Sequence, residues 1–162
     1  MPRQLIVNTS PLIFLSRVDG LEWLARLCRD TVLVPKAVIT ELLAGFDGPP
    51  IVNAVKRNTR FSIIDDVTVP ATILAWDLGA GETQVLGACL ERDGSVAVLD
   101  DKAARQCGMG MGIPVVGTLG VILAAKRSGL IPMAGSVVDQ LLREGLYLER
   151  ALVEKALREV GE

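Results

Sequence analysis

The chain has 162 residues, a length that suits one domain with a single core and layers on both faces of a sheet. Half of the residues are hydrophobic and 22% are charged, a normal globular balance, and the net charge of −2 excludes general attraction to polyanions. Histidine is absent, which excludes Ser-His and Cys-His catalysis, histidine-bound zinc and an imidazole general base.

The remaining composition indicates a cytoplasmic protein. Cys28, Cys89 and Cys107 lie far apart without a CxxC pair, as expected for buried thiols in a reducing compartment. No apolar run approaches the roughly 18 residues that span a bilayer, so we expect no membrane partner. Asn8, Thr9 and Ser10 interrupt the apolar stretch near the N-terminus, so we expect no signal peptide. Aromatic residues make up only 4%, which argues against binding of single-stranded nucleic acid by aromatic stacking.

Short apolar runs predict the strands of a sheet. They cover residues 4–8, 31–34, 61–64, 95–99 and 114–116. The first is apolar at successive positions, as in parallel strands that are buried on both faces.

Helix signals fall between and after these runs. Ser10 and Pro11 predict a helix start, with Ser10 as N-cap and Pro11 in the first helical position. The run Gly48-Pro49-Pro50 predicts a loop, and the segment 70–77 is ambiguous. The expected helices cover residues 12–18, 21–27, 35–44, 51–57, 82–91, 102–107, 118–126, 135–143 and 149–160.

Strands that alternate with helices predict a three-layer α/β/α fold around a parallel sheet of about five strands. No repeat or linker divides the chain, so we expect a single domain over residues 1–162. Its last part, about 133–162, is helical and amphipathic and is expected to pack on the sheet or on a second subunit.

The glycine-rich run 108–112 superficially resembles a dinucleotide-binding fingerprint. It follows a helix instead of a strand, and Pro114 comes after it instead of a helix. We expect a flexible loop that joins a helix to a strand.

Polar residues follow two of the predicted strands, and two glutamates lie on helices between strands. Asn8 follows the first strand, and Asp100 and Asp101 follow the run that ends at Leu99. In an open parallel sheet the ligand site lies beyond the carboxyl ends of the strands. Oxygen ligands at that edge suit Mg²⁺ or Mn²⁺, so the pattern of Asn8, Glu41, Glu82, Asp100 and Asp101 favours metal-dependent phosphate chemistry.

Each of these residues also has a plain structural alternative. Asn8 can bond to the backbone of its own turn, and Glu41 can lie on a solvated helix face beside the apolar stripe. Glu82 stands in the first turn of its helix, where the helix dipole favours an acid. Of Asp100 and Asp101, one is expected to cap the following helix and the other to bind metal.

The order of several short motifs resembles that of PIN-domain proteins over most of the chain. The run 6–13, Ile-Val-Asn-Thr-Ser-Pro-Leu-Ile, is similar to their opening strand and turn, with Asn8 in place of the usual aspartate. Gly81-Glu82-Thr83-Gln84, the run 99–102 (Leu-Asp-Asp-Lys), the run 116–120 (Val-Gly-Thr-Leu-Gly) and the run 127–132 (Arg-Ser-Gly-Leu-Ile-Pro) look like those of a PIN-like bacterial and archaeal subfamily.

This resemblance implies a ribonuclease fold with a carboxylate cluster that holds Mg²⁺ or Mn²⁺. Glu41, Glu82 and Asp101 would be the catalytic acids and metal ligands, with Asn8 and Asp100 as further metal ligands and Thr118 lining the site. It also implies RNA as substrate and the role of a toxin with a protein antitoxin. We consider Lys36, Lys102 and Arg105 candidates for binding the phosphate backbone, although each can be an ordinary surface charge.

Two other functions stay open. One is a catalytically weak or inactive PIN-like module that binds RNA or a protein, because Asn8 offers only a neutral oxygen. The other is a small-molecule phosphatase, which ranks low because the chain lacks a nucleophile motif. The abundant aliphatic residues and the amphipathic tail lead us to expect a homodimer.

Overall fold

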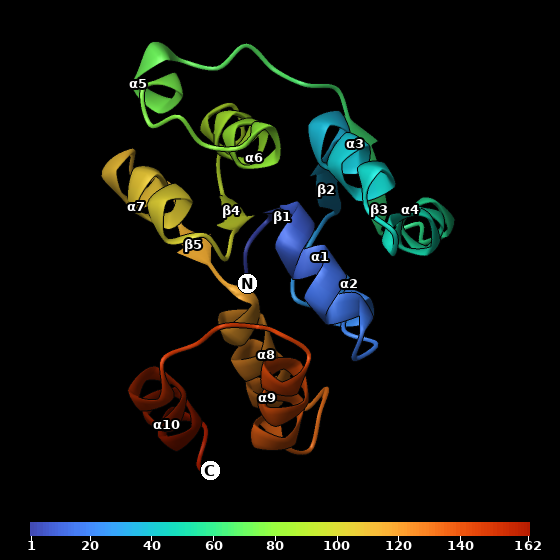
Figure 1. The fold of residues 1–162 in the computed structure, drawn as a ribbon, viewed down its shortest axis with the longest axis vertical. Helices are drawn as coiled ribbons and strands as arrows, with labels where there is room; N and C mark the ends of the chain where they lie inside the picture. Colours follow the sequence, from blue (N-terminus) through green and yellow to red (C-terminus); the bar gives the residue numbers. More distant parts are fainter.

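The protein is built on a five-stranded parallel sheet with the order β3-β2-β1-β4-β5, described by a computed structural model of residues 1–162 (Figure 1). The strands are β1 (Gln4–Val7), β2 (Val32–Pro35), β3 (Phe61–Ile64), β4 (Ser95–Val98) and β5 (Val115–Val116). In the central strand β1, Leu5 is paired with Val32 on one side and with Val96 on the other. The chain builds β2 and β3 on one side of β1 and then β4 and β5 on the other. A crevice therefore opens between β1 and β4 at the carboxyl edge.

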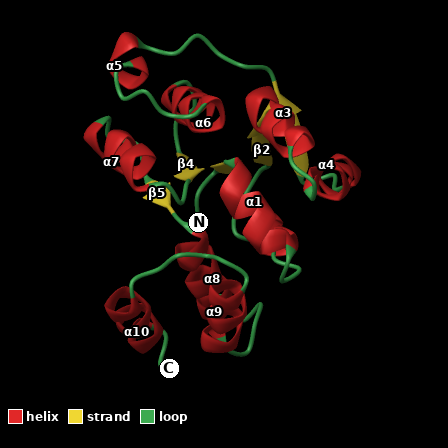
Figure 2. Ribbon diagram, in the orientation of Figure 1, coloured by secondary structure: helices red, strands yellow, loops and turns green.

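Helices cover both faces of this sheet (Figure 2). They are α1 (Thr9–Ser16), α2 (Leu21–Arg26), α3 (Lys36–Ala44), α4 (Gly48–Arg57), α5 (Ala71–Leu74), α6 (Ala80–Leu90), α7 (Lys102–Gly110), α8 (Thr118–Arg127), α9 (Ala134–Arg143) and α10 (Arg150–Glu159). Helix α6 contacts β1, β2 and β4 on one face and packs beside α3 and α7. Helices α1, α2 and α8 contact one another on the opposite side of the sheet in Figure 1. The three-layer α/β/α prediction is confirmed.

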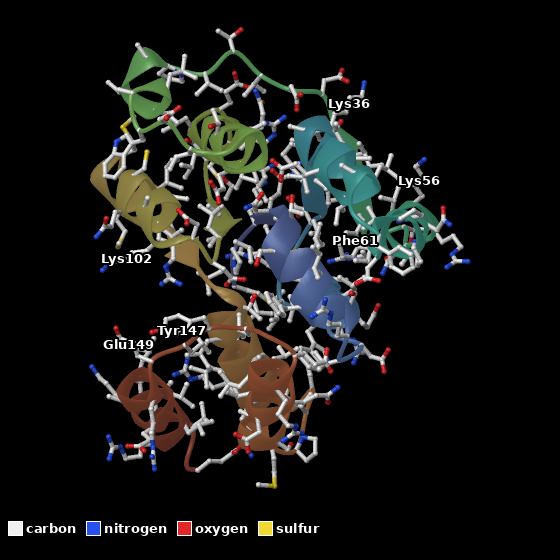
Figure 3. All side chains as sticks on the ribbon, in the orientation of Figure 1. Lys36, Lys56, Phe61, Lys102, Tyr147 and Glu149 are labelled. Atoms are coloured by element: carbon white, nitrogen blue, oxygen red, sulfur yellow. The ribbon has the colours of Figure 1, made fainter.

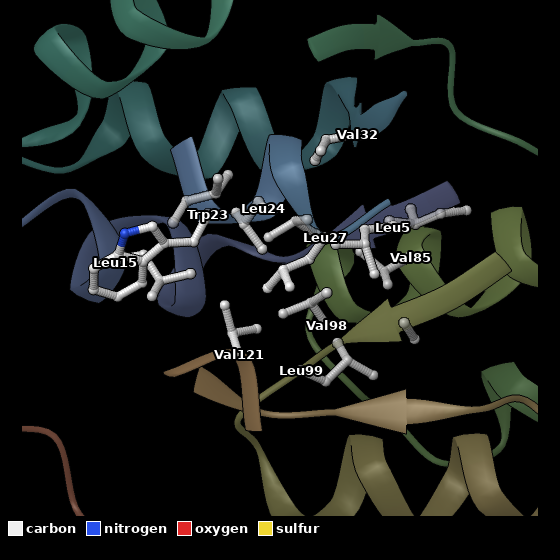
Figure 4. Close-up of a cluster of buried hydrophobic side chains, with 14 of the residues drawn as sticks. Leu5, Leu15, Trp23, Leu24, Leu27, Val32, Val85, Val98, Leu99 and Val121 are labelled. Atoms are coloured by element: carbon white, nitrogen blue, oxygen red, sulfur yellow. The ribbon is translucent and has the colours of Figure 1, made fainter. Parts of the chain in front are cut away.

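The core is one continuous cluster of aliphatic side chains (Figure 4). Leu5 and Val98 from the sheet lie near Leu24 from α2 and Val121 from α8 in this cluster. Burial of such side chains stabilises a fold by roughly 1.5–3 kcal/mol each. The core is therefore sufficient to hold the strand ends, and the polar residues directly after them, in fixed positions.

Three local predictions are wrong at helix ends. Helix α1 starts at Thr9 with Asn8 as the N-cap residue, not Ser10. Pro11 is third in this helix, where its missing N–H costs nothing because the first four N–H groups have no helical partner. Helix α4 likewise starts at Gly48 and includes Pro49 and Pro50 in its first turn.

The glycine-rich run is not the expected loop, because α7 continues through Gly110. A Cβ atom on Gly108 would lie 3.0 Å from the side chain of Leu86, so this glycine allows α7 to pack closely on α6. The turn into β5 comes only at Gly112, whose φ of 73° lies in the left-handed region. The ambiguous segment 70–77 contains the short helix α5.

The last helices, α8, α9 and α10, gather at one end of the molecule in Figure 1. The side chain of Glu162 accepts hydrogen bonds from the N–H groups of Ala134 (2.7 Å) and Gly135 (2.8 Å) at the start of α9. These two bonds lower the pKa of Glu162, and Lys126 adds to the effect. No helix has the length and apolar character that a bilayer span requires.

Candidate functional site

The carboxylate of Asp100 joins the ends of three neighbouring strands. Thr118, which follows β5, donates from its N–H to Asp100 Oδ1 and from its hydroxyl to Asp100 Oδ2, both at 2.7 Å. Ser10, which follows β1, donates to Asp100 Oδ2 at 3.2 Å. Asp100 itself follows β4. Three donors on one carboxylate hold this edge of the sheet together.

A second group of polar atoms surrounds the turn before α6. Glu41 on α3 accepts a hydrogen bond from Gly81 N–H at 2.7 Å with Oε1 and another from the Thr9 hydroxyl with Oε2. A Cβ atom on Gly81 would lie only 2.6 Å from Asn8 Oδ1 and 2.7 Å from Glu41 Oε2. Both oxygens therefore border the same small space, which exists because residue 81 has no side chain.

Asn8 Oδ1 is the one buried side-chain oxygen or nitrogen of the chain without a hydrogen-bond partner. The Asn8 side chain is only 4% exposed, so water does not freely replace that partner. A buried polar atom left unpaired costs about 1–3 kcal/mol. Such an atom in a native structure calls for an explanation, and a site for an ion is one of the recognised ones.

Glu82 extends the acid group toward α7. Its Oε2 accepts a hydrogen bond from Gly79 N–H at 3.1 Å, as an acid at the third position of a helix often does. Burial raises the pKa of Glu82, the bond from Gly79 opposes this, and the negative charges of Asp101 and Glu41 raise it further. Glu82 thus lies within electrostatic reach of both other acids.

Of the two neighbouring aspartates, Asp100 and Asp101, it is Asp101 that caps helix α7. Its Oδ2 accepts a hydrogen bond from Ala104 N–H at 2.9 Å at the start of α7, whereas Asp100 bonds to Ser10 and Thr118. The cap expected at one of these two residues is therefore at Asp101, and the metal binding expected of the other stays a prediction. Asp101 remains exposed to solvent, so its free lone pairs stay accessible.

An open groove of about 800 Å³ runs from Glu82, Asp100 and Asp101 toward α10, and Asn8 and Glu41 do not line it. Glu82, Asp100 and Asp101 line it together with Ser10, and Lys102 and Arg105 of α7 add two cations. Lys36, at the start of α3, does not line this groove, and Figure 3 shows Lys36 and Lys102 on opposite sides of the molecule. Lys36 pairs with Asp65 instead. Of the three predicted phosphate-binding cations, the structure places two at the acids.

The donor set fits a hard divalent cation in kind, because it consists of carboxylate and amide oxygens and includes the unpaired Asn8 Oδ1. No three His, Cys, Asp or Glu side chains lie close enough together to hold an ion by themselves. A bound cation would therefore need Asn8 Oδ1, or water, beside Glu41 and Glu82.

Sequence reasoning missed the residues that position these acids. Thr9 and Gly81 bind Glu41, and Ser10 binds Asp100. The run Gly79-Ala80-Gly81 before Glu82 could have indicated these contacts, since two glycines at a helix start allow other side chains to approach the backbone closely. Tyr147, which also lines the groove, gave no signal in the sequence.

A parallel sheet whose strand order reverses at a polar carboxyl edge defines the class of doubly wound α/β proteins that bind ligands at that edge. The sequence matches the family model described as PIN domain over residues 4–162, and the chain belongs to this family.

A comparison of structures agrees with this membership at the level of the fold. The structure is similar to that of the PIN domain endonuclease Utp24, with a TM-score of 0.54 and 16% sequence identity. The match covers 72% of this chain and 85% of that chain. No protein with a curated function matches the sequence.

Proposed function

We propose that the protein is a metal-dependent ribonuclease that hydrolyses RNA phosphodiesters and acts as the toxin of a toxin–antitoxin pair. The observation that carries the proposal is the buried, unpaired Asn8 Oδ1 beside the carboxylate of Glu41. Membership in the PIN domain family and the likeness to an endonuclease of that fold support it.

In this proposal Asn8, Glu41, Glu82 and Asp101 hold Mg²⁺ or Mn²⁺, with Asp100 as a further oxygen at the same edge. The ion would lower the pKa of a bound water and stabilise charge on the phosphate in the transition state. Thr9 and Gly81 orient Glu41, and Gly79 orients Glu82. Lys102 and Arg105, which line the groove, would bind phosphates of the substrate.

The second candidate is a PIN-like module that binds RNA or a protein without efficient cleavage. The neutral side chain of Asn8 favours it, because an amide oxygen attracts a cation less than a carboxylate does. The need for Asn8 or water to complete the ligand set points in the same direction.

Cleavage of a mixed-sequence single-stranded RNA, with Mn²⁺ and with excess EDTA, tests the proposal. We expect cleavage only with Mn²⁺ and a loss of it in Glu41→Gln and Glu82→Gln. Asp139→Asn, an exposed acid on α9 outside the groove, is the control and should cleave normally. Cleavage that persists in EDTA or in Glu41→Gln would refute the metal-dependent mechanism, and absence of cleavage with bound RNA would favour the binding module.

The toxin role requires a protein partner, and the corner between α3 and α4 offers a surface for one. Leu43 and Phe46 are exposed there, and Phe46 lines a cavity of about 1010 Å³ together with Ile13 and Leu21. Expression of the native chain should arrest growth, and expression of Glu41→Gln should not. Light scattering tests the proposed homodimer, and a monomer at all micromolar concentrations would refute it.

A further inference from the structure

We infer that Tyr147 is a stacking platform for an unpaired base, so that the groove takes single-stranded RNA with one base on the Tyr147 ring. The inference rests on the proposed function, which it deepens by naming the conformation of the substrate and a positioning residue for it.

Tyr147 is held in place but unused within the chain. It is the only tyrosine, its side chain is 87% exposed, and it forms no side-chain hydrogen bond. Its neighbour Leu146 is buried and donates its N–H to Leu141 O at 2.9 Å, while Leu148 on the other side packs against the core. The loop between α9 and α10 is thus anchored on both sides of a projecting ring, which has only two side-chain torsions to fix on binding.

The ring lies at a meeting point of two hollows in the surface. It lines the groove that contains Glu82 and Asp101, and it also lines a second cavity of about 300 Å³ that reaches Lys155 on α10. Figure 3 shows Tyr147 on the side of the molecule where α7 approaches α10 and where Lys102 also lies. A chain that leaves the acids along this path therefore passes the ring.

Three cationic side chains lie along this path. Lys102 and Arg105 line the groove, Arg105 and Lys155 line the second cavity, and none of the three forms an ion pair or side-chain hydrogen bond within the chain. Free cations beside an exposed aromatic ring are the combination by which proteins bind single strands, with phosphates on the cations and bases on the ring.

Single-stranded RNA can stack a base on Tyr147, whereas double-stranded RNA cannot. In a duplex each base is already stacked on its neighbours and its faces are not available, whereas loops and single strands can place a base on an aromatic side chain. The low aromatic content of the chain argues against a row of platforms but allows one at the right place. We therefore assign the groove to an unpaired segment with one base on Tyr147.

Binding of a short fluorescein-labelled single-stranded RNA to the full chain in EDTA, followed by fluorescence anisotropy, tests the inference without cleavage. Tyr147→Ala should weaken binding by about 5- to 150-fold, the loss of one base–aromatic stack. Tyr147→Phe keeps the ring and should bind nearly as the native chain does. Trp76→Ala removes an exposed ring that lines neither the groove nor the second cavity and should have no effect.

Native-like binding by Tyr147→Ala would overturn the inference, as would equal binding of the same RNA as a duplex. A native chain that binds no RNA would also overturn it and would leave an apolar protein segment as the occupant of the groove. Cleavage measured separately with Mn²⁺ distinguishes the two proposals. Tyr147-dependent binding without cleavage refutes only the nuclease, and cleavage without Tyr147 dependence refutes only this inference.

Discussion

Replacing Gly81 with alanine should destabilise the protein, although the same change inside a helix usually stabilises it. Alanine in place of a helical glycine gains roughly 0.5–1 kcal/mol. Here the new Cβ atom would lie 2.6 Å from Asn8 Oδ1 and 2.7 Å from Glu41 Oε2, distances that real Cβ atoms do not adopt. Glu41 cannot move away freely, because Thr9 and the N–H of residue 81 hold both of its oxygens.

The size of the effect results from these opposing contributions. Overpacking costs about 1–3 kcal/mol, and weakening a hydrogen bond to a carboxylate costs up to about 3 kcal/mol more. After subtraction of the helix gain, we expect the free energy of unfolding to fall by about 2 kcal/mol. For a chain of this length that corresponds to a melting temperature lower by roughly 4–8 °C.

Urea and thermal unfolding of Gly81→Ala and Gly110→Ala would measure the effect against a matched control. Gly110 is the last residue of α7, and a Cβ atom there would meet nothing within 4 Å. Gly110→Ala should therefore raise the stability by about 0.5–1 kcal/mol. A Gly81→Ala protein as stable as the native chain would refute the argument that the acids are packed around a missing side chain.

Three further predictions concern a ligand, a helix contact and the core. Asn8→Asp should destabilise the metal-free protein by adding a charge beside Glu41. Calorimetry should show tighter Mn²⁺ binding, because two opposite unit charges 4 Å apart attract by roughly 4 kcal/mol at an effective dielectric near 20, before desolvation is subtracted. Unchanged affinity would show that residue 8 does not face the ion. Glu162→Gln should lower the melting temperature at pH 7. The difference should shrink as the pH falls below about 4.5 and through the lowered folded-state pKa, because that stability is lost on protonation; a difference that stays constant throughout acid titration would contradict this. Leu86→Ala, at a fully buried site, should cost about 2–5 kcal/mol in urea unfolding, and a smaller loss would show that the core collapses around the gap.

The fold could be predicted from the sequence because its strands are short apolar runs separated by clear helix signals. The five predicted strands and the helices between and after them are all present, and errors are confined to helix ends such as those at Thr9 and Gly48. The errors at Thr9 and Gly48 share one cause. Proline and polar residues are read from the sequence as boundaries, whereas the first turn of a helix accommodates both. The single-domain organisation over residues 1–162 stays a prediction.

The candidate site was only partly accessible from the sequence, because residues distant in the chain complete it. Asn8 and the pair at 100–101 follow strands, so topology alone predicts that they share an edge. The contacts of Glu41 with Gly81, forty residues away, and the approach of Tyr147 to the acids depend on how helices pack, which no local pattern encodes. The roles of these residues in metal binding and catalysis remain predictions for the cleavage and calorimetry experiments.

The edges of the sheet restrict how copies of this chain can assemble. Strand β5 has only two residues, so this edge offers few open backbone groups to another strand. The opposite edge strand, β3, has four residues and is packed against α4. Neither edge is a long, flat template for extending the sheet into a second molecule. An assembly of this protein would therefore join through side chains on its helices and loops instead of through paired strands.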